Sequence, residues 1–273
     1  FSRAFAEFAL SELPNNVHEA LVKKYYQNEI VGHVITDASA IEAREKPKKK
    51  ENKVIVDEKK PKKMGRPKKG QEKPKKPQEP TRIEKQVAGQ MTLEEMLADL
   101  PKQCDKGGKT NTKGNLYWWI GYKLHLTVDD HGVPLAGITS SASIHDSQVA
   151  IPLAKLTAQR VSNFYDLMDA GYHAPGIIEH SKSLGHVPII EKPAERGEKE
   201  EKANEKKAWK TLNLKPAEMV RYEARTIVER VFSRFKDEFG GNFVRVRGGA
   251  KVSAHLMFGV LALAADQLIK LIM

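Results

Sequence analysis

A predicted helix in the last quarter of the chain carries the residues best suited to chemistry. The segment from Arg221 to Lys236 has no Gly or Pro, and its apolar residues recur at three- and four-residue steps, which indicates one face against a core. At about 100° per residue, four polar side chains fall within roughly 60° of one another: Tyr222, Arg225, Glu229 and Lys236. A solvated amphipathic helix with an Arg–Glu pair at i,i+4 would account for this pattern. A carboxylate flanked by cations also suits a site that binds a metal ion and phosphate oxygens.

The spacing of these four residues distinguishes the two interpretations. Tyr-x2-Arg-x3-Glu-x6-Lys resembles the signature helix of DDE-type insertion-sequence transposases, whose catalytic core is ribonuclease H-like, and the chain shows this spacing with no departure. The resemblance extends from about residue 1 to the C-terminus. It implies two further carboxylates on strands elsewhere in the chain.

Two aspartates occupy the positions at which the resemblance places these carboxylates. Asp37 is expected near the end of a strand that begins at Val34, and Asp169 ends a predicted strand in Asp-Ala-Gly-Tyr, which resembles the family's second-aspartate motif. A carboxylate at a strand end is often only a turn or cap residue. Asp57 is an alternative to Asp37, because it follows a similar Val-Ile-Val run. We prefer Asp37, because nothing would hold Asp57 in place within its basic surroundings.

The resemblance assigns a role to each of these residues. It implies a catalytic and metal-binding triad of Asp37, Asp169 and Glu229. It implies contacts to phosphates and bases of DNA from Tyr222, Arg225 and Lys236. Three carboxylates at one site repel each other unless a cation neutralises them. Oxygen-only ligands favour Mg²⁺ or Mn²⁺, and two such ions can support hydrolysis and strand transfer without a protein nucleophile.

These implications lead us to expect a metal-dependent DNA transposase that moves an insertion sequence. Its partner would be double-stranded DNA, both the element ends and the target, and a homodimer on DNA is compatible with this activity. Two other hypotheses remain. One is a catalytically inactive, transposase-derived DNA-binding protein. The other is a ribonuclease H-like nuclease that cuts without strand transfer.

One stretch of the chain holds its whole positive excess. Of 46 Lys+Arg and 35 Asp+Glu, 17 and 6 lie between Arg44 and Ile83, which leaves 29 of each sign elsewhere. The stretch is rich in Lys and Pro, so we expect a disordered basic linker over residues 44–83. Within it, Gly-Arg-Pro at 65–67 resembles the core of a minor-groove AT hook, although a plain polybasic linker explains it equally well. In both interpretations Arg66, Lys68 and Lys69 bind DNA phosphates.

Length and composition limit the remaining classes. With 273 residues the chain can bury a sizeable core. Its single cysteine excludes an internal disulfide framework and fits a reducing compartment, so we expect a cytoplasmic, nucleoid-associated protein. The chain begins with Phe1, from which we expect a fragment or a processed start, and no secretory leader is visible. Charged residues such as Asp266 and Lys270 interrupt the apolar segment 256–273, which we expect to be a buried helix rather than a membrane span.

The order of predicted elements indicates an α/β fold, a ribonuclease H-like mixed sheet flanked by helices. We expect this core over residues 31–43 and 84–273, interrupted by the basic linker. Residues 1–30 would add two helices, over 1–10 and about 16–27, that either end an N-terminal DNA-binding domain or brace the core. Asn16 would cap the second helix.

Periodicity places the remaining elements of the core. Strands at 116–128 and 133–143 are expected to form an antiparallel hairpin, and further strands are expected at 163–172 and 186–190. Helices are expected at 92–100, 145–159 and 174–184, a loop at 104–115, and a charged insertion at 193–210. Asp146 is well placed as an N-cap, and Asp166 is expected to be structural.

Overall fold

The fold is described by a computed structural model that covers most of the chain. The structure describes residues 2–47, 80–89, 91–110, 114–192, 204–205, 207 and 216–273. The predictions made for Asp57, Arg66, Lys68 and Lys69 therefore lie outside the described residues, as does most of the predicted charged insertion.

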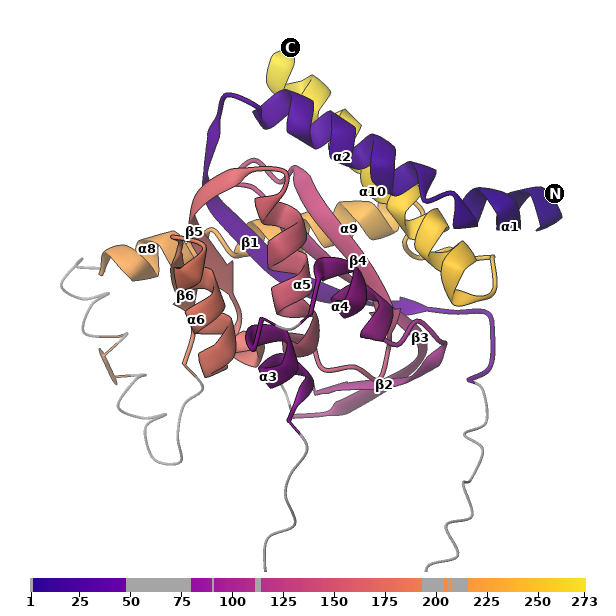
Figure 1. The fold of residues 1–273 in the computed structure, drawn as a ribbon, viewed down its shortest axis with the longest axis horizontal. Helices are drawn as coiled ribbons and strands as arrows, with labels where there is room; N and C mark the ends of the chain where they lie inside the picture. The colour runs from indigo at the N-terminus through magenta and orange to yellow at the C-terminus, as the bar shows by residue number, and fades with distance from the viewer. Residues whose placement is uncertain are drawn as a thin grey trace, which may run out of the picture.

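A mixed sheet forms the centre of the molecule (Figure 1). Its strands are β1 (Ile30–Glu42), β2 (Asp105–Thr110), β3 (Leu116–Val128), β4 (Pro134–Ser141), β5 (Ser162–Met168) and β6 (Val187–Ile190). The order is β2-β3-β1-β5-β6, and β4 pairs with β3. Because Gly121 lies opposite both Glu42 of β1 and Asp105 of β2, β2 and β4 share the edge of β3 that faces away from β1.

The strand directions identify the fold class. β1 runs antiparallel to β3 and parallel to β5, and β5 runs parallel to β6. The predicted hairpin is present, because β3 and β4 pair antiparallel. A long antiparallel meander that leads into parallel strands is the arrangement expected of a ribonuclease H-like sheet, so the predicted fold class is confirmed.

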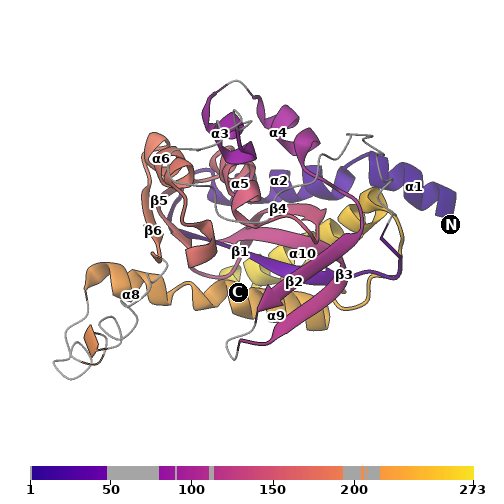
Figure 2. The same cartoon turned by 90° about the horizontal axis from the view of Figure 1, so that it is seen from below.

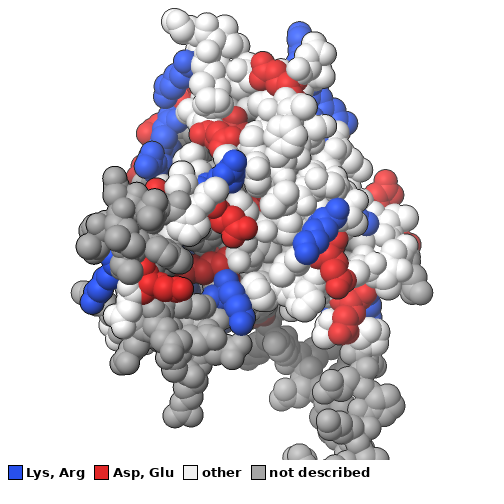
Figure 3. Space-filling view, turned by 90° about the vertical axis from the view of Figure 1, so that its left-hand side faces the viewer, with Lys and Arg blue, Asp and Glu red and all other residues white. Residues whose placement is uncertain are grey.

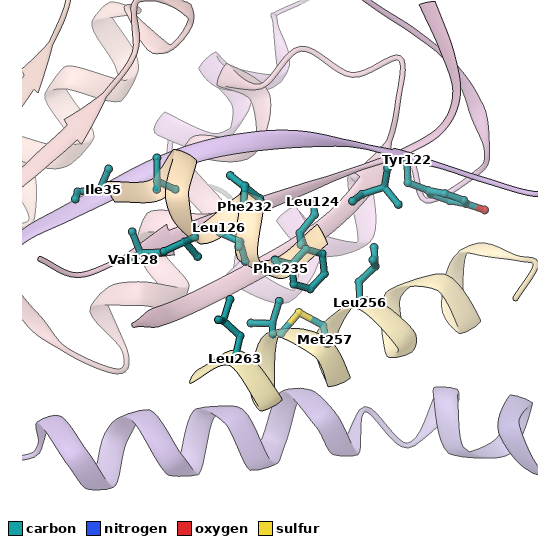
Figure 4. Packing of buried hydrophobic residues seen from close by; sticks show 14 of the residues in the cluster. Ile35, Tyr122, Leu124, Leu126, Val128, Phe232, Phe235, Leu256, Met257 and Leu263 are labelled. Carbon is teal, nitrogen blue, oxygen red and sulfur yellow. The ribbon is translucent and has the colours of Figure 1, made fainter. Parts of the chain in front are cut away.

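One face of the sheet, here called the α9 face, packs against two helices. Side chains alternate along a strand, so the paired residues Ile35, Val128 and Leu167 point to this same face, where they are fully buried. Helices α9 (Thr226–Glu238) and α10 (Gly249–Ile272) cover it and share one core cluster with the sheet. Figure 4 shows Phe232 and Phe235 of α9 and Leu256, Met257 and Leu263 of α10 gathered against the strands.

The opposite face of the sheet carries the remaining helices of the core. Helix α5 (Ser147–Ala158) lies against it, with α6 (Pro175–Ser183), α3 (Arg82–Val87) and α4 (Leu93–Asp99) beside α5 (Figures 1 and 2). Thr81 and Thr92 cap α3 and α4 through reciprocal bonds with Glu84 and Glu95, which stabilises short helices that propensity alone would not. The sheet therefore lies between two helical layers.

The N-terminal helices pack on the outside of α10. Helices α1 (Ser2–Leu10) and α2 (Leu13–Tyr26) contact α10, and the buried side of α2 includes Val22 and Tyr26. The predicted start of α2 at Asn16 is wrong, because the helix begins three residues earlier with Pro14 in its first turn. Proline is tolerated there, since the first N–H groups of a helix have no intrahelical partner.

Helix α10 is long and apolar enough to span a membrane by length and composition, and 44% of its most apolar window is buried. Its buried residues include Leu256, Val260 and Leu263, which join the cluster shared with α9 and the sheet. The helix therefore fills the place of a core helix between the sheet and α2, as the interrupted apolar pattern predicts.

Three further predicted elements differ from the structure. Residues 105–110, expected within a loop, form β2. Strand β1 continues to Glu42, so Asp37 lies in its middle rather than near its end. The signature segment is not one helix but two, because α8 (Ala217–Glu223) ends before α9 begins at Thr226. The body of the protein also extends into both ends of the predicted linker, where Glu45 is hydrogen-bonded and α3 begins at Arg82.

Candidate active site

Strand register places two of the predicted carboxylates next to each other. Thr36 of β1 pairs with Met168 of β5 in the parallel ladder, so Asp37 and Asp169 follow at the same level on neighbouring strands. Asp37 points to the α9 face, because it pairs with Leu126 of the α9-face core. Residues separated by 132 positions in sequence are thus adjacent at the carboxyl end of β5, the usual position of functional groups in parallel strands.

The next strand adds a third carboxylate to this level. Met168 pairs with Ile190 of β6, so Glu191 follows beside Asp169. Asp37, Asp169 and Glu191 therefore form a row across β1, β5 and β6, here called the carboxylate row. Sequence analysis missed Glu191. The signal was its position directly after an apolar strand, the same feature that identified Asp169.

The environment of Asp37 raises its pKa to about 6. Burial is the largest cause, and the negative charge of Asp169 adds to it. The Ala38 N–H, which donates to Asp37 Oδ1 at 2.8 Å, and the charges of Lys109 and Arg225 oppose the shift. A carboxylate that is this reluctant to ionise gains from any cation placed beside it.

Asp169 is fixed by the turn that follows β5. Its Oδ1 accepts a hydrogen bond from Gly171 N at 2.9 Å and caps the short 3₁₀ turn Ala170–Tyr172. A Cβ at position 171 would lie 3.0 Å from Asp169 Oδ1, so glycine allows this close approach. Asp166, by contrast, is buried and accepts from Asn163, Ser181 and His186, in agreement with its predicted structural role.

Arg225 connects the carboxylate row to the signature helix. Its Nη2 donates to Glu229 Oε1 at 2.9 Å, and its Nη1 lies 4.0 Å from Asp37 Oδ2. Burial disfavours its charge, but Tyr222, Glu229 and Asp37 outweigh that effect and raise the pKa of Arg225. The guanidinium therefore stands between two of the three predicted triad members.

Glu229 is the most accessible member of the predicted triad. Its side chain is 55% exposed, whereas that of Asp37 is 20% exposed. Within the described part of the chain, no three His, Cys, Asp or Glu side chains form a group that could hold a metal ion as they stand. The structure brings Asp37 and Asp169 together and links Glu229 to them through Arg225. The donors are all carboxylate oxygens, which fit a hard cation such as Mg²⁺ or Mn²⁺.

Tyr222 lies at the Glu191 end of the carboxylate row. Its hydroxyl donates to Glu191 Oε2 at 3.3 Å, and its ring is 5.8 Å from the Arg225 guanidinium. Burial raises the pKa of Tyr222 to about 12; the Arg225 charge opposes this, and the charges of Glu191 and Asp169 add to it. The phenol therefore stays protonated and available as a hydrogen-bond donor at neutral pH.

Lys236 occupies the far end of the signature segment. It follows Arg225 by eleven positions, which corresponds to about 16 Å of helix. Burial and the charge of Lys109 lower the pKa of Lys236, while Glu42 and Asp237 oppose that shift. Lys109 also acts on Asp37, yet sequence analysis missed it, because its strand was expected to be a loop.

Asp146 differs from its predicted role. It stands at the first position before α5 but makes no capping hydrogen bond. Its Oδ1 instead accepts from Lys123 Nζ at 2.8 Å and lies 4.0 Å from the buried His125 ring. An ion pair to the neighbouring strand therefore replaces the helix cap.

On the side of the molecule that carries α8, the described charges are mixed. Figure 3 shows acidic and basic side chains interspersed on the side of the molecule that carries α8, rather than gathered into one basic patch. This agrees with the equal numbers of acidic and basic residues outside the segment 44–83.

Comparison with known proteins gives one match. Residues 32–265 match a family model described as a transposase DDE domain. No curated protein and no solved structure matches the chain. The matched region begins at the start of β1 and ends within α10, so it contains the whole carboxylate row and both helices of the signature segment.

Proposed function

Because the chain belongs to the transposase DDE domain family, we propose that it cleaves and joins DNA strands at the site around Asp37, Asp169 and Glu229. One observation carries this proposal: Asp37 and Asp169 lie level on adjacent strands, with Arg225 between Asp37 and Glu229. If Asp37 had only a structural role, the protein would gain nothing from burying a carboxyl group and raising its pKa.

Asp37, Asp169 and Glu229 would hold the divalent metal ions of this site. When bound, two Mg²⁺ or Mn²⁺ ions activate a water or a 3′-hydroxyl and stabilise the leaving oxygen of an in-line displacement. Asp37 contributes by being held rigidly in mid-strand, and Asp169 by the turn that fixes its carboxylate. Glu229 is exposed on the first turn of α9, so it can adjust its side chain as ligands arrive.

The cations of the signature segment would hold the DNA backbone. Arg225 now bonds to Glu229 and lies near Asp37. A phosphate offers a guanidinium the same paired oxygens as a carboxylate, so a DNA phosphate can take over this contact and release Glu229. Tyr222 donates a hydrogen bond from the β6 side, and Lys236 supplies a second charge toward the end of β1.

The test compares Glu229→Gln with a matched variant on the same helix. Glu238→Gln makes the same chemical change at a residue that pairs with Arg234 instead. Labelled DNA that carries the ends of the encoding element is incubated with each protein in Mg²⁺, Mn²⁺ or chelator. We expect wild type and Glu238→Gln to cut with either metal, and Glu229→Gln to bind DNA with similar affinity but not to cut.

Two results would replace the proposal. If wild type binds these ends but neither metal supports cutting, the chain is a DNA-binding derivative of a transposase. If wild type cuts but never joins a 3′-end to target DNA, it is a nuclease of the same fold. Cutting by Glu229→Gln at the wild-type rate would remove Glu229 from the site.

A further inference from the structure

The hairpin formed by β2 and β3 exposes an unusual number of large side chains. Leu116, Tyr117, Trp118 and Ile120 are each between 42% and 55% exposed. Figure 1 shows this pair of strands at the lower edge of the molecule, extending beyond the other strands. A concentration of exposed aromatic and aliphatic groups on so short a segment marks an interaction surface.

Trp118 packs on a glycine of the neighbouring strand β2, and this glycine is here called its seat. Gly108 lies opposite it in the β2–β3 ladder, and a Cβ at position 108 would come within 2.6 Å of Trp118 Cζ3 and 2.8 Å of Cε3. The six-membered part of the indole therefore packs directly on Gly108, and a side chain at position 108 would force the ring to move. Packing on the strand fixes the orientation of the ring, while about half of the Trp118 surface stays exposed to solvent.

A lysine ammonium lies over the Trp118 ring. Lys106, two residues before Gly108 on the same side of β2, places its Nζ 4.5 Å from the ring centroid of Trp118. A lysine ammonium can move from an aromatic face to a nearby anion at little cost. The pair thus offers a flat aromatic surface and a mobile positive charge side by side.

The hairpin contacts the strand that carries Asp37. The Tyr117 hydroxyl donates to Glu42 at the end of β1, the strand that carries Asp37. Lys109, opposite Tyr117, lies within electrostatic reach of both Asp37 and Lys236. Along β3, Trp118 is eight residues from Leu126, the partner of Asp37, a distance of at most about 26 Å. That corresponds to roughly eight nucleotides of a B-form strand.

We propose that Trp118, seated on Gly108, is a stacking platform for an unpaired or terminal nucleobase of the DNA strand that enters the carboxylate site. The proposal rests on the proposed function for the identity of its ligand. An aromatic ring beside a lysine matches a base and its phosphate. A base inside a duplex has both faces covered by its neighbours, so a flat ring can reach only a base at an end or in a single-stranded segment.

The experiment measures DNA binding in chelator, so that it does not depend on cleavage. Two duplexes of the same sequence are compared, one blunt and one with a short single-stranded overhang. Trp118→Ala should weaken binding to the overhang DNA by at least about 5-fold, the lower end of the contribution of one stacked base. It should leave binding to the blunt duplex within twofold of wild type.

Three further variants make the test specific. Trp118→Phe keeps a ring and should restore most of the affinity for overhang DNA. Gly108→Val keeps the tryptophan but removes its seat, so it should reproduce the loss seen with Trp118→Ala. Leu116→Ala removes a side chain of similar exposure that cannot stack, and it should bind both DNAs as wild type does. Thermal unfolding of each variant confirms that it folds.

Several outcomes would overturn the platform. Equal losses on blunt and overhang DNA would show a general contact rather than stacking, and unchanged binding would show no contact. If Trp118→Ala instead converts a self-associated protein to a monomer by light scattering, the exposed hairpin joins copies of the chain. Failure of the cleavage test with overhang binding intact would refute the proposed chemistry alone, because the binding assay contains no metal.

Discussion

Replacing Asp37 by Asn should stabilise the fold in the absence of metal. The side chain is only 20% exposed, and its pKa is raised to about 6, chiefly by burial. Asn has nearly the same shape, and its Oδ1 can still accept from the Ala38 N–H. The variant therefore removes the cost of a buried charge and retains the local hydrogen bond.

The size of this effect follows from linkage. For an acid whose pKa is raised by folding, stability is fully present below the unfolded pKa and is lost as the pH rises through the folded pKa. With an ordinary pKa near 4 and a folded value of about 6, the raised pKa of Asp37 lowers the free energy of unfolding relative to its low-pH value. The loss is about 1 kcal/mol at pH 4.5, where folded Asp37 is still mostly protonated, and about 3 kcal/mol at pH 7.5, where it is ionised. Asp37→Asn should recover up to these amounts.

Urea and thermal unfolding in chelator provide the assay. At pH 7.5 a gain of about 3 kcal/mol corresponds to a rise in Tm of roughly 6–12 °C for a protein of this size. The gain should shrink to about a third at pH 4.5. Added Mg²⁺ should raise the Tm of wild type more than that of the variant, because the proposed site has lost a charged ligand.

Asp237→Asn serves as the control, because Asp237 is exposed on α9 and accepts hydrogen bonds from Ser233 and Asn242. It should change stability by less than about 0.5 kcal/mol at either pH. The reasoning is refuted if Asp37→Asn is no more stable than wild type at pH 7.5 in chelator. It is equally refuted if the gain is as large at pH 4.5 as at pH 7.5.

Three further predictions concern other parts of the molecule. Asp166→Ala should destabilise the fold by about 3 kcal/mol in urea unfolding, because it removes the buried acceptor shared by Asn163, Ser181 and His186, while the Mg²⁺-dependent rise in Tm persists. Arg225→Ala should weaken DNA binding roughly tenfold and reduce the slope of log Kd against log salt by about 1, whereas a salt slope equal to that of wild type would exclude a phosphate contact. Replacing residues 48–79 by a neutral Gly–Ser linker of equal length should reduce nonspecific DNA binding and its salt dependence while the Tm changes little; a lost unfolding transition would show that the segment belongs to the core.

The sequence predicted those parts of the fold that follow from local hydrophobic patterns. The strand Leu116–Val128 was predicted with its observed bounds, because its even-numbered residues from Tyr122 on are apolar and buried. Strand β2 was missed, because Gly107 and Gly108 have low strand propensity. They are favoured there by cross-strand tryptophans that leave no room for a Cβ, a fact visible only once the partner strand is known.

The candidate site was predictable to the extent that a resemblance supplied the residues. That resemblance could not give the length of β1, which continues past Asp37 because Ala38, Ser39 and Ala40 pair with β3. It also could not place Glu191 or Lys109, whose proximity depends on strand register and on a strand that was not expected. The positions of Glu191 and Lys109 both depend on which strands pair across long sequence separations, and local sequence carries little information about that pairing.

The break between α8 and α9 explains how one sequence spacing serves a site that spans several strands. No Gly or Pro marks it; instead, Ala224 and Arg225 donate to the carbonyls three residues earlier, at 3.0 Å each, so that the turn tightens. Such local 3₁₀ geometry allows α8 to change direction, and Tyr222 reaches Glu191 at the end of β6.

Helix α9 is oriented independently of α8, because Val228 and Phe235 are fully buried against the sheet. This packing delivers Arg225 to the level of Asp37 and directs Lys236 toward the end of β1. Three of the signature residues thus act along the site in turn. Tyr222 hydrogen-bonds Glu191 just after β6, Arg225 lies near Asp37 of β1, and Lys236 is within electrostatic reach of Glu42 at the end of β1. The break between α8 and α9 therefore lets one short sequence spacing serve partners at the end of β6, in the middle of β1 and at the end of β1.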